Sequence, residues 1–221
     1  TVAWEANDDD LKRVFRENKI KIHAHNAMGV LKEKAPTGYE QPYYDYIRTG
    51  VHLVNYGGKA RTLSGALGTS EYEAQRCINL WFSLHPGILD WHERLLDSLN
   101  RARCIYNKFG YRRFYFDRIQ DLLPEAAAWI GQSTTACVTN RALTAIRDAK
   151  QLVSDPRIEL LFQVHDEIVF QYPISHRDQV LRNLKPLVHI TIPYDDPLVI
   201  PWGLKTSTVS WGDCAKAQWP V

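Results

Sequence analysis

Three consecutive polar residues, His165, Asp166 and Glu167, separate two apolar segments in the last third of the chain. The flanking segments, residues 158–162 and 168–170, are rich in β-branched and aromatic residues, which predicts two strands. Adjacent carboxylates repel each other, and Asp-Glu is a poor pair for a hairpin turn that needs positive φ. A divalent cation such as Mg²⁺ would remove this conflict, because it prefers carboxylate oxygens. The alternative is a solvated turn whose acids only face water.

A second pattern lies on a helix expected over residues 44–56. Its apolar residues recur at spacing i, i+4 and i+7 and predict a buried face: Ile47, Val51 and Val54. Arg48, His52 and Tyr56 recur every fourth residue, so they form a ridge on a different face. Gly57 follows and is expected to end the helix. The ridge is either a binding surface or the polar outer face of a packed helix.

The composition allows several classes of protein and excludes few. The chain has 221 residues, 45% of them hydrophobic and 24% charged, enough for one large domain or two small ones. A net charge of +2 neither requires nor excludes a nucleic-acid partner. The four cysteines are scattered without a CxxC pair, so we expect reduced thiols and no zinc ribbon. The sequence has no apolar run long enough to span a membrane, and no membrane partner is expected.

The remaining elements follow from periodicity and from Gly and Pro positions. Helices are expected over residues 8–18, with Asn7 or Asp8 as N-cap, and over residues 23–34, 59–67, 70–82, 88–102, 125–150 and 176–187. Further strands are expected over residues 104–106, 114–116 and 198–209. The predicted fold class is therefore α+β: helix-rich, with a small antiparallel sheet supplied mainly by the C-terminal third.

The segment from Val164 to Glu167 resembles the third palm motif of family A DNA polymerases, the group of bacterial DNA polymerase I and many phage replicases. The helix with Arg48, His52 and Tyr56 resembles the second motif, the fingers helix that grips the incoming nucleotide. A cation there can reach the roughly four negative charges of a triphosphate.

Other matches occur in the right order along nearly the whole chain. Ile22-His23 resembles a segment whose histidine contacts the phosphates, although Lys21 replaces the usual acid. The turn that carries Arg112 and Arg113 resembles the family's arginine-rich hairpin near the duplex. Gln132 begins a segment that resembles the helix touching the minor groove, where an amide can sense correct pairing. Taken singly, these residues could equally be a helix cap, a basic turn and a polar helix position.

The resemblance implies a two-metal mechanism with two Mg²⁺ ions, dNTPs and primer–template DNA. Asp166 would hold metal and Glu167 would support the site. His165 and Gln163 would lie near the primer–template. On the fingers, Arg48 and His23 would stabilise the triphosphate, and His52 and Tyr56 would lie along the sugar and base.

Several positions depart from the family pattern. Tyr44 stands where an Arg is usual, Arg48 replaces Lys, and His52 replaces an aromatic residue that influences sugar discrimination. The first palm motif, with its metal-binding Asp, is expected just upstream of Thr1, and residues 2–4 resemble the strand that follows it. The chain is thus expected to be a truncation, a split half or an extein that needs an N-terminal polymerase segment or a parent chain.

The implied domains are residues 1–22 as a palm segment, 23–102 as fingers and 103–221 as the rest of the palm. The place of action is expected to be the cytoplasm of a bacterium or a phage-infected host cell. Two other classes stay open: a non-catalytic nucleic-acid-binding remnant, and a metal-dependent hydrolase using residues 165–167. A single-subunit RNA polymerase is a weaker relative of the same interpretation.

Overall fold

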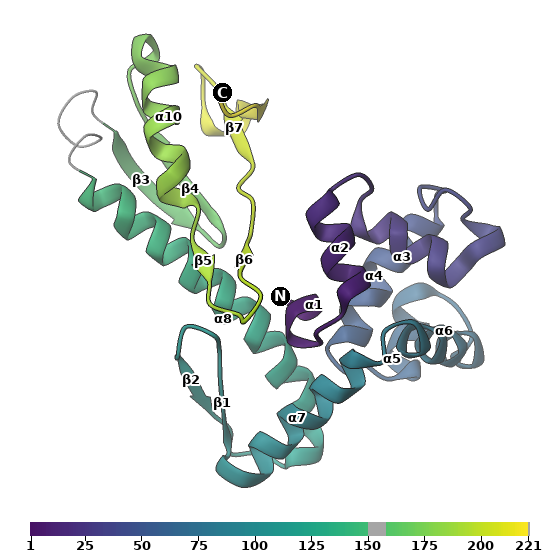
Figure 1. The fold of residues 1–221 in the computed structure, drawn as a ribbon. Coiled ribbons are helices and arrows are strands. Elements are labelled where there is room, and N and C mark those ends of the chain that lie inside the picture. Colours follow the sequence, from purple (N-terminus) through teal and green to yellow (C-terminus); the bar gives the residue numbers. More distant parts are fainter. Residues whose placement is uncertain (150–157, 221) are drawn as a thin grey trace. The chain divides into compact units, whose positions relative to one another are not determined.

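The computed structural model describes residues 1–149 and 158–220, which form two compact units (Figure 1). The first unit is Thr1–Gly131 and the second is Gln132–Val221. Helices dominate, and the strands pair as two-stranded antiparallel ladders, so the α+β class is confirmed. In the part of the chain described, no helix is long and apolar enough to cross a membrane.

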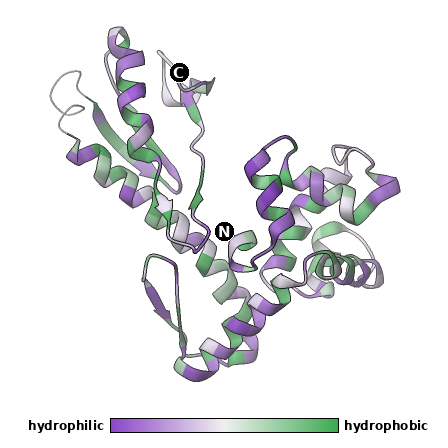
Figure 2. Cartoon of the chain, viewed as in Figure 1, coloured by the Kyte–Doolittle hydropathy of each residue, from purple (hydrophilic) through white to green (hydrophobic). Residues whose placement is uncertain are grey.

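The first unit is helical apart from one hairpin. Its elements are α1 (Val2–Glu5), α2 (Asp9–Glu17), α3 (Ile22–Leu31), α4 (Tyr43–Asn55), α5 (Ala60–Leu67), α6 (Glu71–Leu84), α7 (Gly87–Ala102), β1 (Cys104–Tyr106) and β2 (Arg112–Phe114). Helix α8 (Ile119–Asp148) begins in this unit and continues into the second. Hydrophobic and hydrophilic residues alternate along these helices (Figure 2), as expected for helices with one buried face.

Helix α4 packs as its periodicity predicts. Ile47, Val51 and Val54 are all buried, whereas Arg48 and His52 are exposed on another face. The helix ends at Asn55, and Gly57 follows with a φ of 75°, a conformation that favours glycine. A Cβ on Gly57 would also lie 2.9 Å from the Leu123 side chain, so a side chain there would be obstructed as well as strained.

A buried polar network holds the C-terminal end of α4 against two other helices. Trp81 of α6 donates its Nε1–H to the Asn55 side-chain oxygen at 2.9 Å. The His92 ring on α7 bonds through Nε2 to the Asn55 carbonyl at 2.8 Å. A carbonyl only accepts, so His92 Nε2 carries the proton. Burial lowers the pKa of His92, so the ring is neutral at pH 7, and the hydrogen bond only partly opposes this shift.

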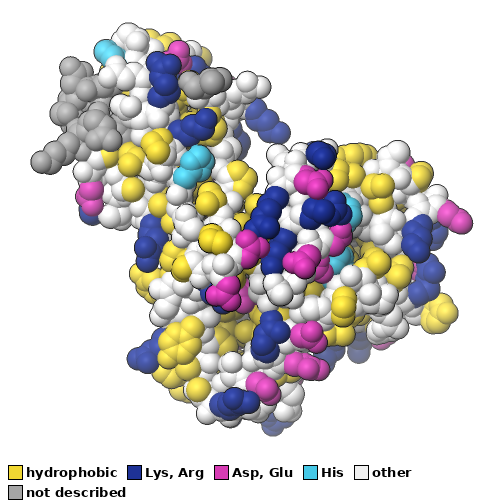
Figure 3. All heavy atoms as spheres, in the orientation of Figure 1, with side chains coloured by type: hydrophobic (Ala, Val, Ile, Leu, Met, Phe, Trp, Pro, Cys, Tyr) yellow, Lys and Arg dark blue, Asp and Glu magenta, His cyan; other side chains and the backbone are white. Residues whose placement is uncertain are grey.

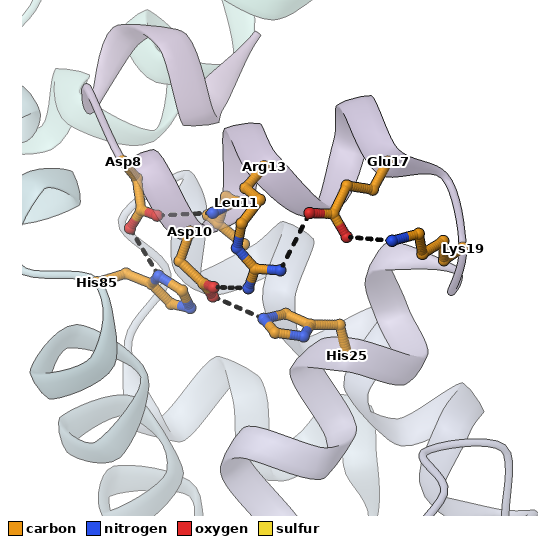
Figure 4. Close-up of polar contacts among 8 residues, drawn as sticks. All are labelled: Asp8, Asp10, Leu11, Arg13, Glu17, Lys19, His25 and His85. Carbon is orange, nitrogen blue, oxygen red and sulfur yellow. Dashed lines mark hydrogen bonds and ion pairs between the residues drawn. The ribbon is translucent and has the colours of Figure 1, made fainter.

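Helix α2 is tied to the unit by two His–Asp pairs (Figure 4). Asp8 is its N-cap: the carboxylate accepts from the Leu11 amide at 2.8 Å and pairs with His85 Nδ1 at 2.6 Å. Burial works against the charge on Asp8, but the bonds from His85 and Leu11 prevail and lower the carboxyl pKa. Asp10 makes a second pair, with His25 at 2.6 Å.

The second unit combines the rest of α8 with short strands. Its other elements are β3 (Glu159–Val164), β4 (Glu167–Gln171), α10 (Arg177–Val188), β5 (Thr191–Ile192), β6 (Leu198–Val199), β7 (Leu204–Thr206) and β8 (Ala215–Ala217). One apolar cluster joins α8, α10 and β7, through residues that include Ile146, Leu181, Leu184 and Leu204. Ile168 and Phe170 of β4 pack against this cluster, so it positions the β3–β4 hairpin.

The surface carries both signs of charge. Figure 3 shows Lys and Arg side chains interspersed with Asp and Glu over the visible face, in keeping with a net charge of only +2. Any nucleic-acid contact therefore depends on local clusters of cations rather than on the total charge.

The N-terminal and central expectations need correction in three places. Residues 2–4 form helix α1 rather than a strand, because the Thr1 carbonyl accepts from the Trp4 and Glu5 amides. Helix α3 ends at Leu31, and residues 32–34 form a 3-10 turn. Helix α8 begins at Ile119, since Pro124 near a helix start removes only one hydrogen bond; the expected end at residue 150 lies outside the described residues.

The strand predictions also need correction. The second strand of the first hairpin is Arg112–Phe114 rather than residues 114–116, because Gly110 closes the turn early. The strand expected over residues 198–209 is two short strands, β6 and β7, which pair with β5 and β8 respectively. Pro201 and Gly203 lie between them and disfavour a continuous strand. The strands form separate ladders instead of one sheet.

Replacing Asp8 with Ala should lower the free energy of unfolding of the first unit by about 3 kcal/mol, because it leaves His85 unpaired and α2 uncapped. The carboxyl pKa is lower in the folded than in the unfolded chain. The stabilisation is therefore complete above the unfolded value of about 3.9 and is lost as the pH falls through the folded value.

Urea unfolding of both proteins, with hydrogen exchange of α2 amides to locate the change, measures this difference at pH 7 and below pH 4. The matched control is Asp9→Ala, because the Asp9 side chain is 94% exposed and makes only a 3.8 Å contact to Lys12. An equal loss of stability in the two variants would contradict the role given to Asp8.

Candidate nucleotide and nucleic-acid interface

Four residues predicted from two separate motifs lie together in the first unit. We name this set, His23, Arg48, His52 and Tyr56, the nucleotide cluster. The His23 ring of α3 lies 5.4 Å from the His52 ring of α4, measured between centroids. The Tyr56 ring follows one turn later, 6.5 Å from His52. Contacts between α3 and α4 thus bring together residues that are about thirty positions apart in the sequence.

The nucleotide cluster has unsatisfied polar and cationic groups. His23 Nδ1 is buried and has no hydrogen-bond partner among the described residues. Burial, followed by the nearby His52 and Arg48, lowers the His23 pKa, so its ring is neutral at pH 7. Arg48 makes only a 3.7 Å surface pair with Asp45, a contact worth at most about 1 kcal/mol. An anion beside these groups would form an ion pair with the Arg48 guanidinium. It could also accept a hydrogen bond from a ring N–H of His23.

An aromatic border beside the nucleotide cluster was not predicted. Tyr44 contacts the His23 ring edge-to-face at 6.1 Å, and Tyr39 stacks on Tyr44 at 6.0 Å. The Lys21 ammonium lies 6.0 Å from the Tyr44 ring. Tyr44 had been noted only as a departure from the family's arginine. Its position one turn before Arg48 on the same ridge was the signal that could have placed it here.

In the second unit, the β3–β4 hairpin turns through His165 and Asp166, whereas Glu167 already belongs to β4 and pairs with Val164. His165 has a φ of 50°, a left-handed conformation that costs a non-glycine residue roughly 1–2 kcal/mol. Gln163 donates from its side-chain amide to the His165 carbonyl at 3.1 Å, which supports the turn. His165 is therefore the residue of this turn that adopts positive φ, whereas Asp166 and Glu167 do not.

The two acids of this hairpin have different partners. Lys205 of β7 donates to Glu167 at 2.9 Å, and this carboxylate is the main cause that raises the pKa of Lys205. Asp166 is exposed and makes no hydrogen bond or salt bridge with the described residues. All three side chains line a cavity of about 1150 Å³ in the second unit. Lys205 was missed because 38 positions separate it from Glu167 and no local pattern connects them.

The available acids suit part of a magnesium site. Proteins hold Mg²⁺ through one or two carboxylates, with water and substrate phosphates as the other ligands. Asp166 offers one such carboxylate. Within residues 1–149 and 158–220, no group of three or more His, Cys, Asp or Glu side chains is placed to hold an ion. A metal at Asp166 would therefore take its other ligands from a substrate, water or another polypeptide segment.

The predicted DNA-binding residues are exposed. Arg112 and Arg113 lie on β2, where Arg113 forms an ion pair with Glu125 and Arg112 lies over the Phe114 ring at 5.0 Å. Gln132 is exposed on α8, at the start of the second unit. Their exposure leaves these side chains accessible to a ligand.

Known proteins match this chain along most of its length. The family model described as DNA polymerase family A matches residues 1–208. A thermostable DNA polymerase I of Thermus filiformis is 30% identical over 216 residues, which cover 92% of this chain and 25% of that protein. The DNA polymerase I of Pseudomonas aeruginosa is 29% identical over 214 residues, 92% of this chain and 23% of that protein. The chain thus spans about a quarter of the length of these curated relatives.

The fold is also similar to a solved polymerase. The structure described as the POL domain of Pol1 from M. smegmatis in complex with DNA primer-template and dNTP matches with a TM-score of 0.75. The match covers 85% of this chain and 34% of that one, at 19% identity, and it supports the fold alone. With the family model matching nearly its whole length, the chain belongs to DNA polymerase family A.

Proposed function

We propose that this chain carries the nucleotide-binding residues and one metal-binding acid of a template-directed DNA polymerase. The reaction is nucleotidyl transfer from a dNTP to the primer 3′-hydroxyl, with release of pyrophosphate. The observation that carries the proposal is the 5.4 Å approach of His23 to His52 beside Arg48, which gathers anion-binding groups from two motifs. The M. smegmatis relative was solved with DNA primer-template and dNTP, which supports the choice of ligands.

In this proposal the first unit binds the triphosphate. Arg48 pairs with phosphate oxygens through charge-assisted hydrogen bonds, and His23 adds a ring nitrogen that has no partner in the described protein. Negative charge leaves with the pyrophosphate, so groups fixed in place before reaction stabilise its departure. His52 and Tyr56, on the same ridge, lie along the sugar and base.

The hairpin of the second unit supplies the acid. Asp166 would hold Mg²⁺, and the metal would supply neutralisation of phosphate charge and activation of the primer 3′-hydroxyl. Glu167 supports the turn through its bond to Lys205, and His165 and Gln163 face the primer–template. Arg112, Arg113 and Gln132 contact the duplex, largely through its backbone and minor groove.

A second acid for the two-metal mechanism would come from an upstream polymerase segment or parent chain. The proposed division is that of the sequence prediction: palm over residues 1–22, fingers over 23–102 and palm again over 103–221. The proposed setting is the cytoplasm of a bacterium or a phage-infected cell. The remnant alternative keeps the DNA contacts but makes Asp166 dispensable. Family membership argues against the hydrolase alternative.

Primer extension with Mg²⁺ and dNTPs tests this proposal. The chain is mixed with a polypeptide that supplies the thumb and the first palm motif. Asp166→Ala should lower the extension rate roughly a thousandfold, because metal-based charge stabilisation worth several kcal/mol is lost. Asp178→Ala, which removes a 61%-exposed acid on α10, is the matched control and should extend normally.

Two results would contradict the proposal. Full extension by Asp166→Ala would remove its metal role and favour the remnant. Robust extension by the 221-residue chain alone would show that no second acid from elsewhere is needed.

Binding of a dNTP should take up protons near neutral pH. The His23 pKa is lowered in the free protein, and a bound phosphate would raise it. Affinity should therefore rise as the pH falls from about 8 towards the unperturbed histidine value of about 6.5. The triphosphate of the dNTP also takes up protons, but equally for every protein variant, so a difference between variants reports the protein.

Calorimetry in buffers of different ionisation enthalpy counts the protons taken up. His23→Gln should take up fewer protons than wild type, whereas His189→Gln, an exposed residue of the second unit, should not differ. Equal uptake by His23→Gln and wild type would exclude His23 as the proton acceptor.

A further inference from the structure

The segment from Arg103 to Arg118 differs in composition from the rest of the chain. It contains five Lys or Arg residues and a single acid, a net charge of +4, while the whole chain carries only +2. Six of its sixteen residues are aromatic, against 11% overall. Strand β2 appears hydrophilic in Figure 2, and hydrophobic side chains lie beside Lys and Arg over this hairpin in Figure 3.

The register places two aromatic side chains and one cation along a single face of this hairpin, and a third aromatic residue follows the ladder. Tyr106 pairs with Arg112 and Cys104 with Phe114, and paired residues share a face. Phe116 lies two positions after Phe114 and just beyond β2; because the intervening Tyr115 is only 3% exposed, we infer that Phe116 faces the same side as Phe114. Tyr106, Phe114 and Phe116 are 56%, 47% and 89% exposed. We name Tyr106, Arg112, Phe114 and Phe116 the aromatic face.

Local contacts hold the aromatic face in place. The Tyr115 amide donates to the Arg103 carbonyl at 2.8 Å, which extends the β1–β2 pairing beyond Phe114. Asn107 accepts from the Phe109 and Tyr111 amides at 3.0 and 3.1 Å and fixes the turn. The Arg112 guanidinium lies 5.0 Å from the centre of the Phe114 ring, so cation and ring already form a stack. The backbone of the hairpin and the Phe114 ring are therefore held in place, and a ring held in this way loses little freedom when a ligand stacks on it.

The spacing favours unpaired bases over a duplex. Residues two apart on a strand lie roughly 6.6 Å from each other, about twice the 3.4 Å rise of one B-form strand. Rings at this spacing can stack on successive bases only where the nucleic-acid strand is stretched and its bases are not stacked on each other. In a duplex the faces of the bases are covered by their neighbours, whereas a single strand offers them to aromatic side chains. The positive charge of the segment matches the phosphates of such a strand.

From these observations we propose that the aromatic face binds single-stranded nucleic acid by stacking, independently of the nucleotide cluster and of Asp166. Phe116, Phe114 and Tyr106 stack on successive bases, and Arg112 contacts the backbone or a base face. This site goes beyond the proposed polymerase chemistry. It requires neither metal nor dNTP, and it assigns to the hairpin a single strand rather than the duplex alone.

Anisotropy of a fluorescent 12-nucleotide oligo(dT), titrated with the full chain at low salt, tests this site. An abasic phosphodiester of the same length serves as the second probe, since it keeps the charge and lacks the bases. Phe116→Ala should weaken oligo(dT) binding by at least about fivefold, because stacking on one ring accounts for that much per base. It should leave abasic binding unchanged. Arg112→Ala should weaken both probes, since it removes a phosphate-directed cation.

Tyr72→Ala is the matched control, because Tyr72 is 80% exposed on α6, outside the hairpin. Binding is measured without Mg²⁺ and without dNTP, which separates this site from the polymerase proposal. Equal oligo(dT) affinity in Phe116→Ala and Tyr72→Ala would overturn the inference. So would an equal loss by Phe116→Ala on oligo(dT) and on the abasic probe. Thermal melting of each variant excludes unfolding as the cause.

Discussion

The position of α4 depends on Asn55, a single buried amide that uses both its side chain and its carbonyl. Trp81 and His92 donate to it from two different helices, so a shift of α4 would leave polar groups unpaired in a dry core. Dispersion and burial of the apolar face hold α4 against its neighbours, but they are not directional. The hydrogen bonds of Asn55 are directional, so they fix the position of α4 along its axis. The ridge of Arg48, His52 and Tyr56 lies on a different face of the same helix, so its position is fixed as well. This holds the His52 ring close to the His23 ring.

Each unit has polar or charged groups that lack a full partner among the described residues. In the first, a neutral imidazole without a partner stands beside a weakly paired guanidinium. In the second, an unpaired carboxylate follows a strained turn residue, and its neighbour is already neutralised by Lys205. The partnerless His23 ring nitrogen and the positive φ of His165 each break a local rule, as residues at functional sites often do.

Sequence periodicity predicted the helices well, because burial of one face sets both their spacing and their limits, as for Ile47, Val51 and Val54. Strand predictions failed where one residue decided the outcome: Gly110 shortened a turn, and Pro201 with Gly203 interrupted a strand. The candidate site residues His23, Arg48 and Asp166 come from motif wording and stay predictions. Lys205 and Tyr39 were not predicted, since their contacts arise only from tertiary packing.

Within residues 1–149 and 158–220, β3 pairs only with β4, which has a consequence for handling the protein. A two-stranded ladder has two open edges, each with unpaired amide and carbonyl groups. On β3 the neighbouring Leu161 and Phe162 are also 49% and 44% exposed. Such an edge can pair with further strands, including those of other copies of the chain. Aggregation of the purified chain should therefore increase with its concentration. It should decrease when a strand-forming polypeptide covers the hairpin.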